Sequence, residues 1–288
     1  MNPAGRKSET GVFRLGGPAK ACCTPRFPVA DNPRTPVRTW SEFHRRWAGV
    51  QNFLMAGECV PFAYELPPLA RVVEELQADP DARITPGVKG DRLNLTDMAA
   101  EFRAQPVAEA LRRPFALAHF SLARFDAPGR CLHGFTAAVL DRWQAALRAA
   151  GFTWERCYPI VFISGIGCAT NYHMDFSHVL AWQVYGTKRF CGLRDPDRWA
   201  PREVRVNYKV EGFAKPAAIT DADAECFTMR PGDVLWNMLL TPHWVEAGSE
   251  VAMSINLSHG GLRLNGELCP HEAELVAHRG ANPVAVRS

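Results

Sequence analysis

Two side chains that bind metals, His173 and Asp175, stand two positions apart in this chain, and a further histidine, His243, follows far downstream. Residues i and i+2 of a β-strand point to the same side, so on a strand this imidazole and this carboxylate would face one point. Two histidines and one carboxylate with open coordination positions suit non-haem Fe(II) and its chemistry with O₂. Met174 would point to the other side. The alternative is a polar strand end beside a turn.

Further motifs surround this triplet. Lys188 stands fifteen positions after His173 in a Gly-x-Lys segment, and Thr170 precedes that histidine by three. A Pro-Gly-Asp turn at 231–233 comes before the downstream His243. This combination resembles the JmjC and cupin-like Fe(II)/2-oxoglutarate hydroxylases.

That resemblance, which spans residues 110–260, implies an Fe(II) centre that uses 2-oxoglutarate as co-substrate and O₂ as oxidant. The metal ligands that it implies are His173, Asp175 and His243. The remote carboxylate of 2-oxoglutarate needs a cation and a hydroxyl donor, and the resemblance places Lys188 and Thr170 there. A solvated edge charge is the alternative for Lys188. Asn256, in the closing strand, is implied as a further co-substrate contact, with a satisfied core amide as its alternative.

The chain departs from the family pattern four residues after Asp175. Some members carry an asparagine there that holds the co-substrate, whereas this chain has Val179. The adjacent His178 replaces that contact, faces the substrate, or is a plain strand histidine. We name His178 and Trp236 as candidates for the substrate pocket, with a core position as the alternative for the tryptophan.

Two kinds of pattern would position these residues. Apolar residues recur at helical spacing between 39 and 155, which predicts a mainly helical annex. From 156 to 262, short apolar segments alternate with turn signals, which is typical of strands in a sandwich or barrel. Together with the resemblance, this predicts an α+β, β-rich fold with a double-stranded β-helix (jelly-roll, cupin) core and an N-terminal helical annex.

The two ends of the chain differ from this region. Residues 1–38 are rich in proline, glycine and basic residues with few periodic apolar positions, which predicts a disordered or extended arm. Residues 39–288 are interpreted as a single catalytic domain, of which 263–288 form a C-terminal tail.

Composition limits the function classes and the compartment. A net charge of +3 gives no case for nucleic-acid binding through bulk electrostatics. Nine cysteines without a C-x-x-C motif speak against a disulfide scaffold and a thiolate zinc site, so we expect buried free thiols, such as Cys191, in a reducing cytosol. The Cys22-Cys23 pair is interpreted as part of a flexible segment without a role, with metal binding as the alternative. No apolar segment suits a membrane span or a secretory leader, so we expect a cytoplasmic protein without a membrane partner.

By resemblance, the chain is predicted to be a 2-oxoglutarate-dependent dioxygenase. It would hydroxylate a C–H bond of a peptide or protein side chain and release succinate and CO₂. The same chemistry on a small biosynthetic metabolite stays open, as do a non-catalytic cupin-type metal-binding protein and a zinc-dependent isomerase. Lys188 separates a 2-oxoglutarate-dependent catalyst, whether its substrate is a peptide or a metabolite, from a simple metal-binding protein, which does not need it. The sequence separates neither hydroxylation from demethylation, desaturation or cyclisation nor a monomer from a homodimer.

Overall fold

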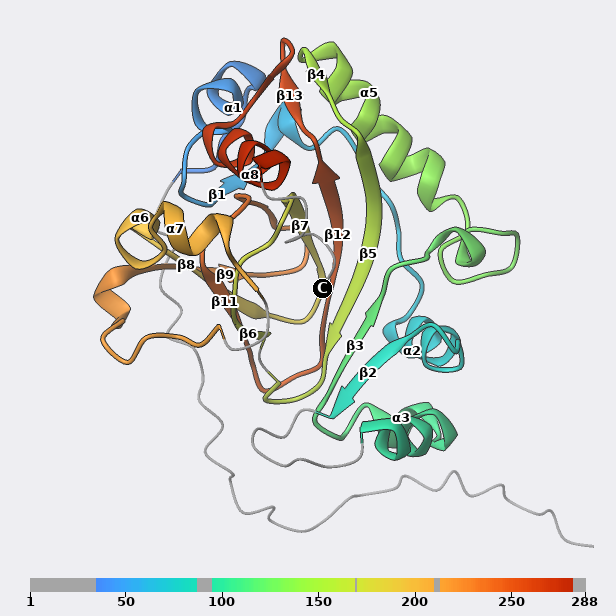
Figure 1. The fold of residues 1–288 in the computed structure, drawn as a ribbon. Coiled ribbons are helices and arrows are strands. Elements are labelled where there is room, and N and C mark those ends of the chain that lie inside the picture. The colour runs from blue at the N-terminus through green and yellow to red at the C-terminus, as the bar shows by residue number, and fades with distance from the viewer. Residues whose placement is uncertain (1–34, 87–94, 169, 210–212, 282–288) are drawn as a thin grey trace, which may run out of the picture.

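In the computed structural model of this chain, the described residues are 35–86, 95–168, 170–209 and 213–281. Their strands form one sheet of seven strands, one of four and one of three. The two larger sheets curve around a common interior, and helices lie outside them (Figure 1). None of the helices in these ranges is long and apolar enough to cross a membrane.

The large sheet has the strand order β1-β10-β7-β12-β5-β3-β2, and every neighbouring pair is antiparallel. In that order the strands are Phe53–Met55, Val234–Asn237, His178–Tyr185, Ala252–Gly260, Arg156–Ser164, Phe115–His119 and Arg83–Pro86. Segments far apart in sequence therefore share one sheet, as the double-stranded β-helix requires.

The second sheet has the order β6-β11-β8-β9, again with antiparallel neighbours. Its strands are Thr170–His173, His243–Ala247, Lys188–Leu193 and Ala224–Met229. A small sheet of β14 (Glu267–Leu268), β13 (Arg263–Leu264) and β4 (Phe152–Thr153) lies near one end of the large one (Figure 1).

Eight α-helices and four short helical turns complete the described part of the chain. The α-helices are α1 Trp40–Arg46, α2 Leu69–Gln77, α3 Leu95–Ala104, α4 Val107–Ala110, α5 Asp141–Ala149, α6 Pro196–Trp199, α7 Arg202–Val206 and α8 Pro270–Ala281. The turns are η1 Gly57–Cys59, η2 Ala123–Phe125, η3 Thr136–Leu140 and η4 Asp221–Asp223. Thr39 begins α1 with a capping box that it forms with Glu42.

The outer face of the large sheet is covered by aromatic packing. Trp236 on β10 contacts Phe43 of α1 at 5.0 Å and Trp143 of α5 at 6.1 Å between ring centroids. All three side chains are fully buried. Because apolar burial is the main favourable contribution to folding, this layer fixes α1 and α5 on the sheet and leaves the opposite face for a cavity.

The predicted α+β, β-rich fold with a double-stranded β-helix core is confirmed. The region 39–155 is more than a helical annex, however, since it supplies β1, β2 and β3 to the large sheet. Most of the arm expected at 1–38 lies outside the described residues, and within it Val37 is buried and bridges Met55. The tail expected at 263–288 contains α8, whose Leu275 is buried.

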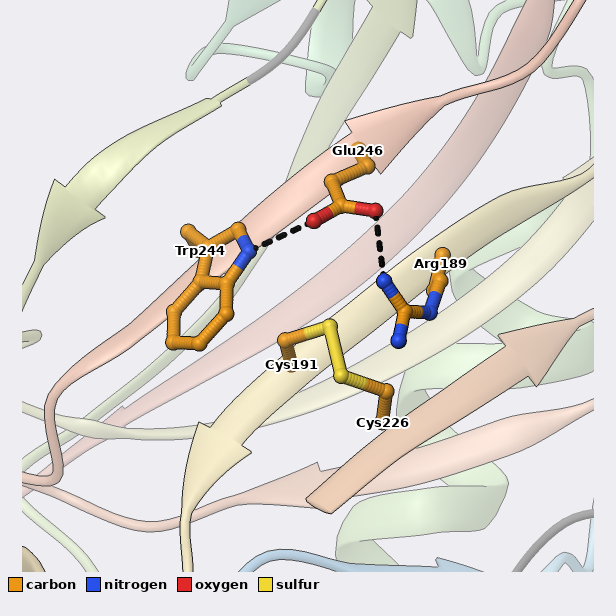
Figure 2. Close-up of a disulfide and its surroundings, with 5 residues drawn as sticks. All are labelled: Arg189, Cys191, Cys226, Trp244 and Glu246. Carbon is orange, nitrogen blue, oxygen red and sulfur yellow. Dashed lines mark hydrogen bonds and ion pairs between the residues drawn. A yellow bond between two sulfur atoms is a disulfide. The ribbon is translucent and has the colours of Figure 1, made fainter. Parts of the chain in front are cut away.

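One expectation about the cysteines is wrong. Cys191 on β8 and Cys226 on β9 form a disulfide (Figure 2). Beside it, Trp244 and Arg189 both donate hydrogen bonds to the carboxylate of Glu246. The two cysteines are direct register partners with Cα atoms 4.1 Å apart, although 35 positions separate them in sequence. Strand register, rather than a local motif, brings them together. The cysteines that remain free in the described ranges are Cys59, Cys131, Cys157, Cys168 and Cys269.

Candidate metal centre and co-substrate cavity

The three predicted metal ligands meet at one point of the structure. His173 ends β6 and His243 begins β11, and the two are register partners, which brings their ring centroids to 4.2 Å. An oxygen of Asp175 lies 3.6 Å from Nε2 of His173, and its other oxygen lies 3.6 Å from Nε2 of His243. One donor atom of each residue lies within 4.8 Å of the others, an arrangement that can hold a metal ion.

The position of Asp175 differs from the strand argument in one respect. β6 ends at His173, so Asp175 stands in the irregular segment after the strand. Met174 between them is buried on the other side, as expected, and its backbone N–H donates to the hydroxyl of Tyr208 over 3.1 Å. The backbone oxygen of Asp175 accepts from Leu240 N over 2.8 Å. Contacts to other elements, rather than a strand ladder, therefore hold Met174 and Asp175.

Hydrogen bonds orient both imidazoles. Nδ1 of His173 lies 2.7 Å from the carbonyl of Asn171, and Nδ1 of His243 lies 2.9 Å from that of Thr241. Because a carbonyl only accepts, each Nδ1 carries a proton, and this contact directs each Nε2 toward Asp175. The ring of Phe190 stacks on His243 at 5.0 Å and fixes its plane.

Burial keeps His243 neutral. It lowers the pKa of His243 to about 4, as does the neighbouring His173 to a smaller extent, whereas Asp175 acts in the opposite direction. A neutral imidazole is the form that binds metals. His243 is therefore ready to act as a ligand throughout the physiological pH range.

A cavity of about 280 Å³ opens from this point between the two larger sheets. Both sheets contribute to its lining, which includes the three ligand candidates and every residue that the sequence assigns to 2-oxoglutarate. Those residues are Thr170, Lys188 and Asn256. Apolar side chains such as Ile160, Phe162 and Val179 fill much of the remaining wall, which favours exclusion of water.

Lys188 is a buried cation at the wall of this cavity. Its side chain is 6% exposed, and Nζ donates to the carbonyl of Phe162 over 3.3 Å. Burial lowers the pKa of Lys188 to about 7. Among the described residues that line the cavity, Asp175 is the only carboxylate, and it faces the two histidines. The ammonium thus lacks a fixed counter-ion, which costs free energy unless an anion binds beside it.

The other two residues assigned to 2-oxoglutarate differ in burial. Asn256 is half-buried, and its Oδ1 has no hydrogen-bond partner in the described part of the chain. Thr170 is exposed, and it also borders a second hollow beside Trp244. Asn256 therefore offers a free acceptor inside the cavity, whereas the hydroxyl of Thr170 stands at its edge.

The structure does not bring His178 and Trp236 to this cavity, so their assignment to the substrate pocket is corrected. Strand alternation explains the difference, because Val179 on β7 and Asn237 on β10 line the cavity and their preceding neighbours point to the other face. There Trp236 belongs to the aromatic layer, and His178 stacks on it at 5.7 Å.

Comparisons with known proteins give likenesses at the level of structure. No family model matches the chain, and no curated protein matches it. The structure of YcfD, a ribosomal oxygenase from Escherichia coli, has 16% identity and a TM-score of 0.46 over 83% of this chain and 53% of that chain. Its complex with cobalt and 2-oxoglutarate has 16% identity and a TM-score of 0.47, with 76% of this chain and 51% of that chain covered. A point mutant of Bacillus subtilis oxalate decarboxylase OxdC has 11% identity and a TM-score of 0.27, with 51% of this chain and 26% of that chain covered. This chain thus spans about half the length of the ribosomal oxygenase structures.

Several residues of the site escaped the sequence analysis. Asn237 donates from Nδ2 to Oδ2 of Asp175 over 2.8 Å, and Phe190 packs on His243. Ser177 and Ser258, joined by a 2.8 Å hydrogen bond between hydroxyls, line the cavity together with the exposed Tyr158. The period of two along 156–164 and 252–260 was the available signal, since alternate residues of β5 and β12 face the cavity.

Proposed function

We propose that this chain is an Fe(II)- and 2-oxoglutarate-dependent dioxygenase that hydroxylates a C–H bond of a peptide or protein side chain. The observation that carries the proposal is the buried ammonium of Lys188 in the same cavity as His173, Asp175 and His243. A metal ion alone would account for His173, Asp175 and His243 but not for Lys188. An anionic ligand that binds both the metal and the ammonium accounts for all four residues.

The residues present fit both iron and 2-oxoglutarate. Two imidazoles and one carboxylate would hold Fe(II), and the Nδ1 hydrogen bonds of His173 and His243 direct both Nε2 atoms at it. Lys188 would pair with the remote carboxylate of 2-oxoglutarate, with Thr170 and Asn256 as further polar contacts. When bound, iron and co-substrate supply the oxidising chemistry, in which substrate, O₂ and 2-oxoglutarate become hydroxylated product, succinate and CO₂.

The protein contributes positioning and a dry site. Asn237 holds the carboxylate of Asp175 toward the two histidines, and Phe190 holds the plane of His243. The backbone carbonyl of Phe162 accepts from Lys188, and Phe162 also lines the cavity. Excluding water strengthens the attraction between the ammonium and an anionic co-substrate, because the local dielectric is low.

A polypeptide substrate is proposed from the surroundings of the cavity. Tyr158 lines the cavity and is 39% exposed, and Phe176, between the lining residues Asp175 and Ser177, is 36% exposed. Exposed aromatic side chains are enriched at surfaces that bind partner proteins. The hydroxyls of Ser177 and Ser258 add polar contacts nearby.

The decisive experiment follows the chelate directly. Anaerobic protein is mixed with Fe(II) and 2-oxoglutarate, and the weak visible charge-transfer band of the chelate is recorded. We expect the band in the wild type and its loss in His173→Ala and Asp175→Ala. Lys188→Met should keep metal binding but require more 2-oxoglutarate, whereas the exposed Lys209→Met is the matched control.

The outcomes separate the competing functions. A wild type that binds Fe(II) but never forms the band is a metal-binding protein or an isomerase, and the oxygenase proposal then fails. The wild type could instead form the band while its succinate formation is raised by small metabolites and not by peptides. The substrate would then be a metabolite, and the proposal of a polypeptide substrate would fail.

A further inference from the structure

A second group of metal-binding side chains lies on the other face of the large sheet. His178 begins β7, Cys269 immediately precedes α8, and Glu272 lies in the first turn of that helix. All three are buried, and one donor atom of each lies within 4.8 Å of the others. Sγ of Cys269 stands 3.4 Å from Nε2 of His178. None of the three residues lines the co-substrate cavity.

The carboxylate of Glu272 supplies an independent indication of a ligand. One oxygen, Oε1, accepts from the backbone N–H of Gly261 over 2.9 Å. The other, Oε2, is buried and has no hydrogen-bond partner in the described ranges, although the residue is only 6% exposed. Burial raises the pKa of Glu272, so the group lacks sufficient compensation for its charge. A buried carboxylate in this position is stabilised by binding a cation.

We propose that His178, Cys269 and Glu272 bind a zinc ion. Zinc accepts this set of ligands, and a thiolate with a carboxylate neutralises its two positive charges in a buried site. Bonds of about 2.3 Å to sulfur and about 2.0 Å to nitrogen at a tetrahedral angle place those atoms roughly 3.5 Å apart, close to the contact between Cys269 and His178. On binding, Cys269 loses its thiol proton, and any proton held by Glu272 is released with it.

The histidine must also change its protonated nitrogen. Nδ1 of His178 faces the backbone N–H of Leu239 at 3.4 Å, so in the metal-free protein the proton resides on Nε2 and points toward Cys269. Zinc at Nε2 moves this proton to Nδ1, and the long contact to Leu239 opens. Zinc binding is therefore accompanied by a local shift of the segment after β10.

The zinc ion would cross-link two elements of the fold, α8 and β7. It joins α8 to the beginning of β7, three positions after Asp175. Its three ligands are buried, so access for a substrate is lacking and a structural role follows. The thiolate favours zinc here, whereas the sulfur-free set of His173, Asp175 and His243 favours Fe(II).

Cobalt provides the test because only a thiolate gives an intense near-ultraviolet sulfur-to-cobalt charge-transfer band. Protein is stripped with a chelator, kept anaerobic without a dithiol so that the disulfide between Cys191 and Cys226 stays intact, and titrated with Co²⁺. We expect the band in the wild type, its loss in Cys269→Ala, and its retention in Cys59→Ala, which removes another buried free thiol. Glu272→Gln should weaken the site by at least about tenfold, since even the outer partners of metal ligands are worth that much.

Two comparisons exclude other sources of the band. His173→Ala removes the proposed iron site and should leave the band unchanged, so failure of the oxygenase proposal does not affect this test. Cys22→Ser/Cys23→Ser should leave it unchanged as well. A wild type without the band, or a band that survives in Cys269→Ala, overturns the zinc site. Zinc analysis of the purified wild type should give one more equivalent than Cys269→Ala.

Discussion

The carboxamide of Asn237 donates from Nδ2 to Oδ2 of Asp175 over 2.8 Å. Asn237 ends β10 in the large sheet, whereas Asp175 follows β6 of the second sheet. This hydrogen bond therefore couples the carboxylate of the metal site to the opposite sheet. It sets the direction of a ligand that the end of β6 leaves without a strand ladder.

Replacing Asn237 by alanine should weaken metal binding by about 10- to 100-fold, because partners that orient metal ligands contribute on that scale. Anaerobic titration with Fe(II) measures the change. Asn207→Ala is the matched control, since that exposed amide donates to the backbone carbonyl of Glu203 and does not line the cavity. An affinity unchanged in Asn237→Ala would mean that Asp175 is oriented by its backbone alone.

The affinity for 2-oxoglutarate should depend on pH through Lys188. Its pKa of about 7 in the free protein means that the ammonium is present below pH 7 and is lost above it. A bound dianion favours the ammonium, so affinity should be constant below pH 7 and fall about tenfold per pH unit above it. Titrations between pH 6 and 9 report this slope. Lys188→Met should bind weakly with no such slope, and a flat wild-type profile contradicts the assignment.

Reduction of the disulfide between Cys191 and Cys226 should lower the free energy of unfolding by about 4 kcal/mol, given a sequence separation of 35. Denaturant unfolding with and without a dithiol measures the difference, and Cys226→Ser should reproduce it. Thiol titration of denatured protein should find two more thiols after reduction. If the thiol count is the same before and after reduction, Cys191 and Cys226 are free in solution and the disulfide prediction fails. Cys157→Ser, which removes a free thiol, is the control.

Acid should destabilise the metal-free fold through three buried histidines. Burial lowers the pKa of His178 to about 3 and that of His243 and His259 to about 4, from 6.5. Between these values and 6.5 the unfolded chain binds protons that the folded chain does not, so stability falls as pH decreases below 6.5. Three protons correspond to roughly 4 kcal/mol per pH unit.

Unfolding by urea between pH 7 and 5, with a chelator present, measures that slope. His259→Gln keeps an acceptor for Trp143, whose Nε1 donates to His259 over 2.7 Å, and should remove about one proton from the slope. His133→Gln, at an exposed position, should leave it unchanged. An equal slope in all three proteins would show that other groups cause the acid sensitivity.

The sequence predicted the centre of the site better than its surroundings. His173, Asp175, Lys188 and His243 are recognisable because their residue types and spacing match a motif that can be seen in the sequence and their chemistry is specific. Asn237 was not, since an amide gains its role only from the fold that places it beside a carboxylate. His178 and Trp236 were misassigned because neighbouring strand residues face opposite sides of the sheet. Which side faces the cavity depends on strand register, and the local sequence does not determine that register.

Distant pairing explains the other differences. Phe53 of β1 pairs with Trp236 of β10, far along the chain, and the disulfide depends on the register of β8 with β9. Helical periodicity is sufficient to indicate a helix at α2, because Val72, Val73 and Leu76 recur at helical spacing and are buried. A three-residue strand such as β1 carries no comparable period.

The attachment of β1 and β3 to the large sheet has a consequence for its two sides. β1 covers the free side of β10, and β3 covers that of β5. A fragment that begins at residue 156 would present both backbones to solvent with unpaired N–H and carbonyl groups. Such open edges recruit strands from other molecules, so the shorter chain should self-associate although it keeps every residue proposed to bind iron and 2-oxoglutarate. The N-terminal strands thus protect the protein from aggregation.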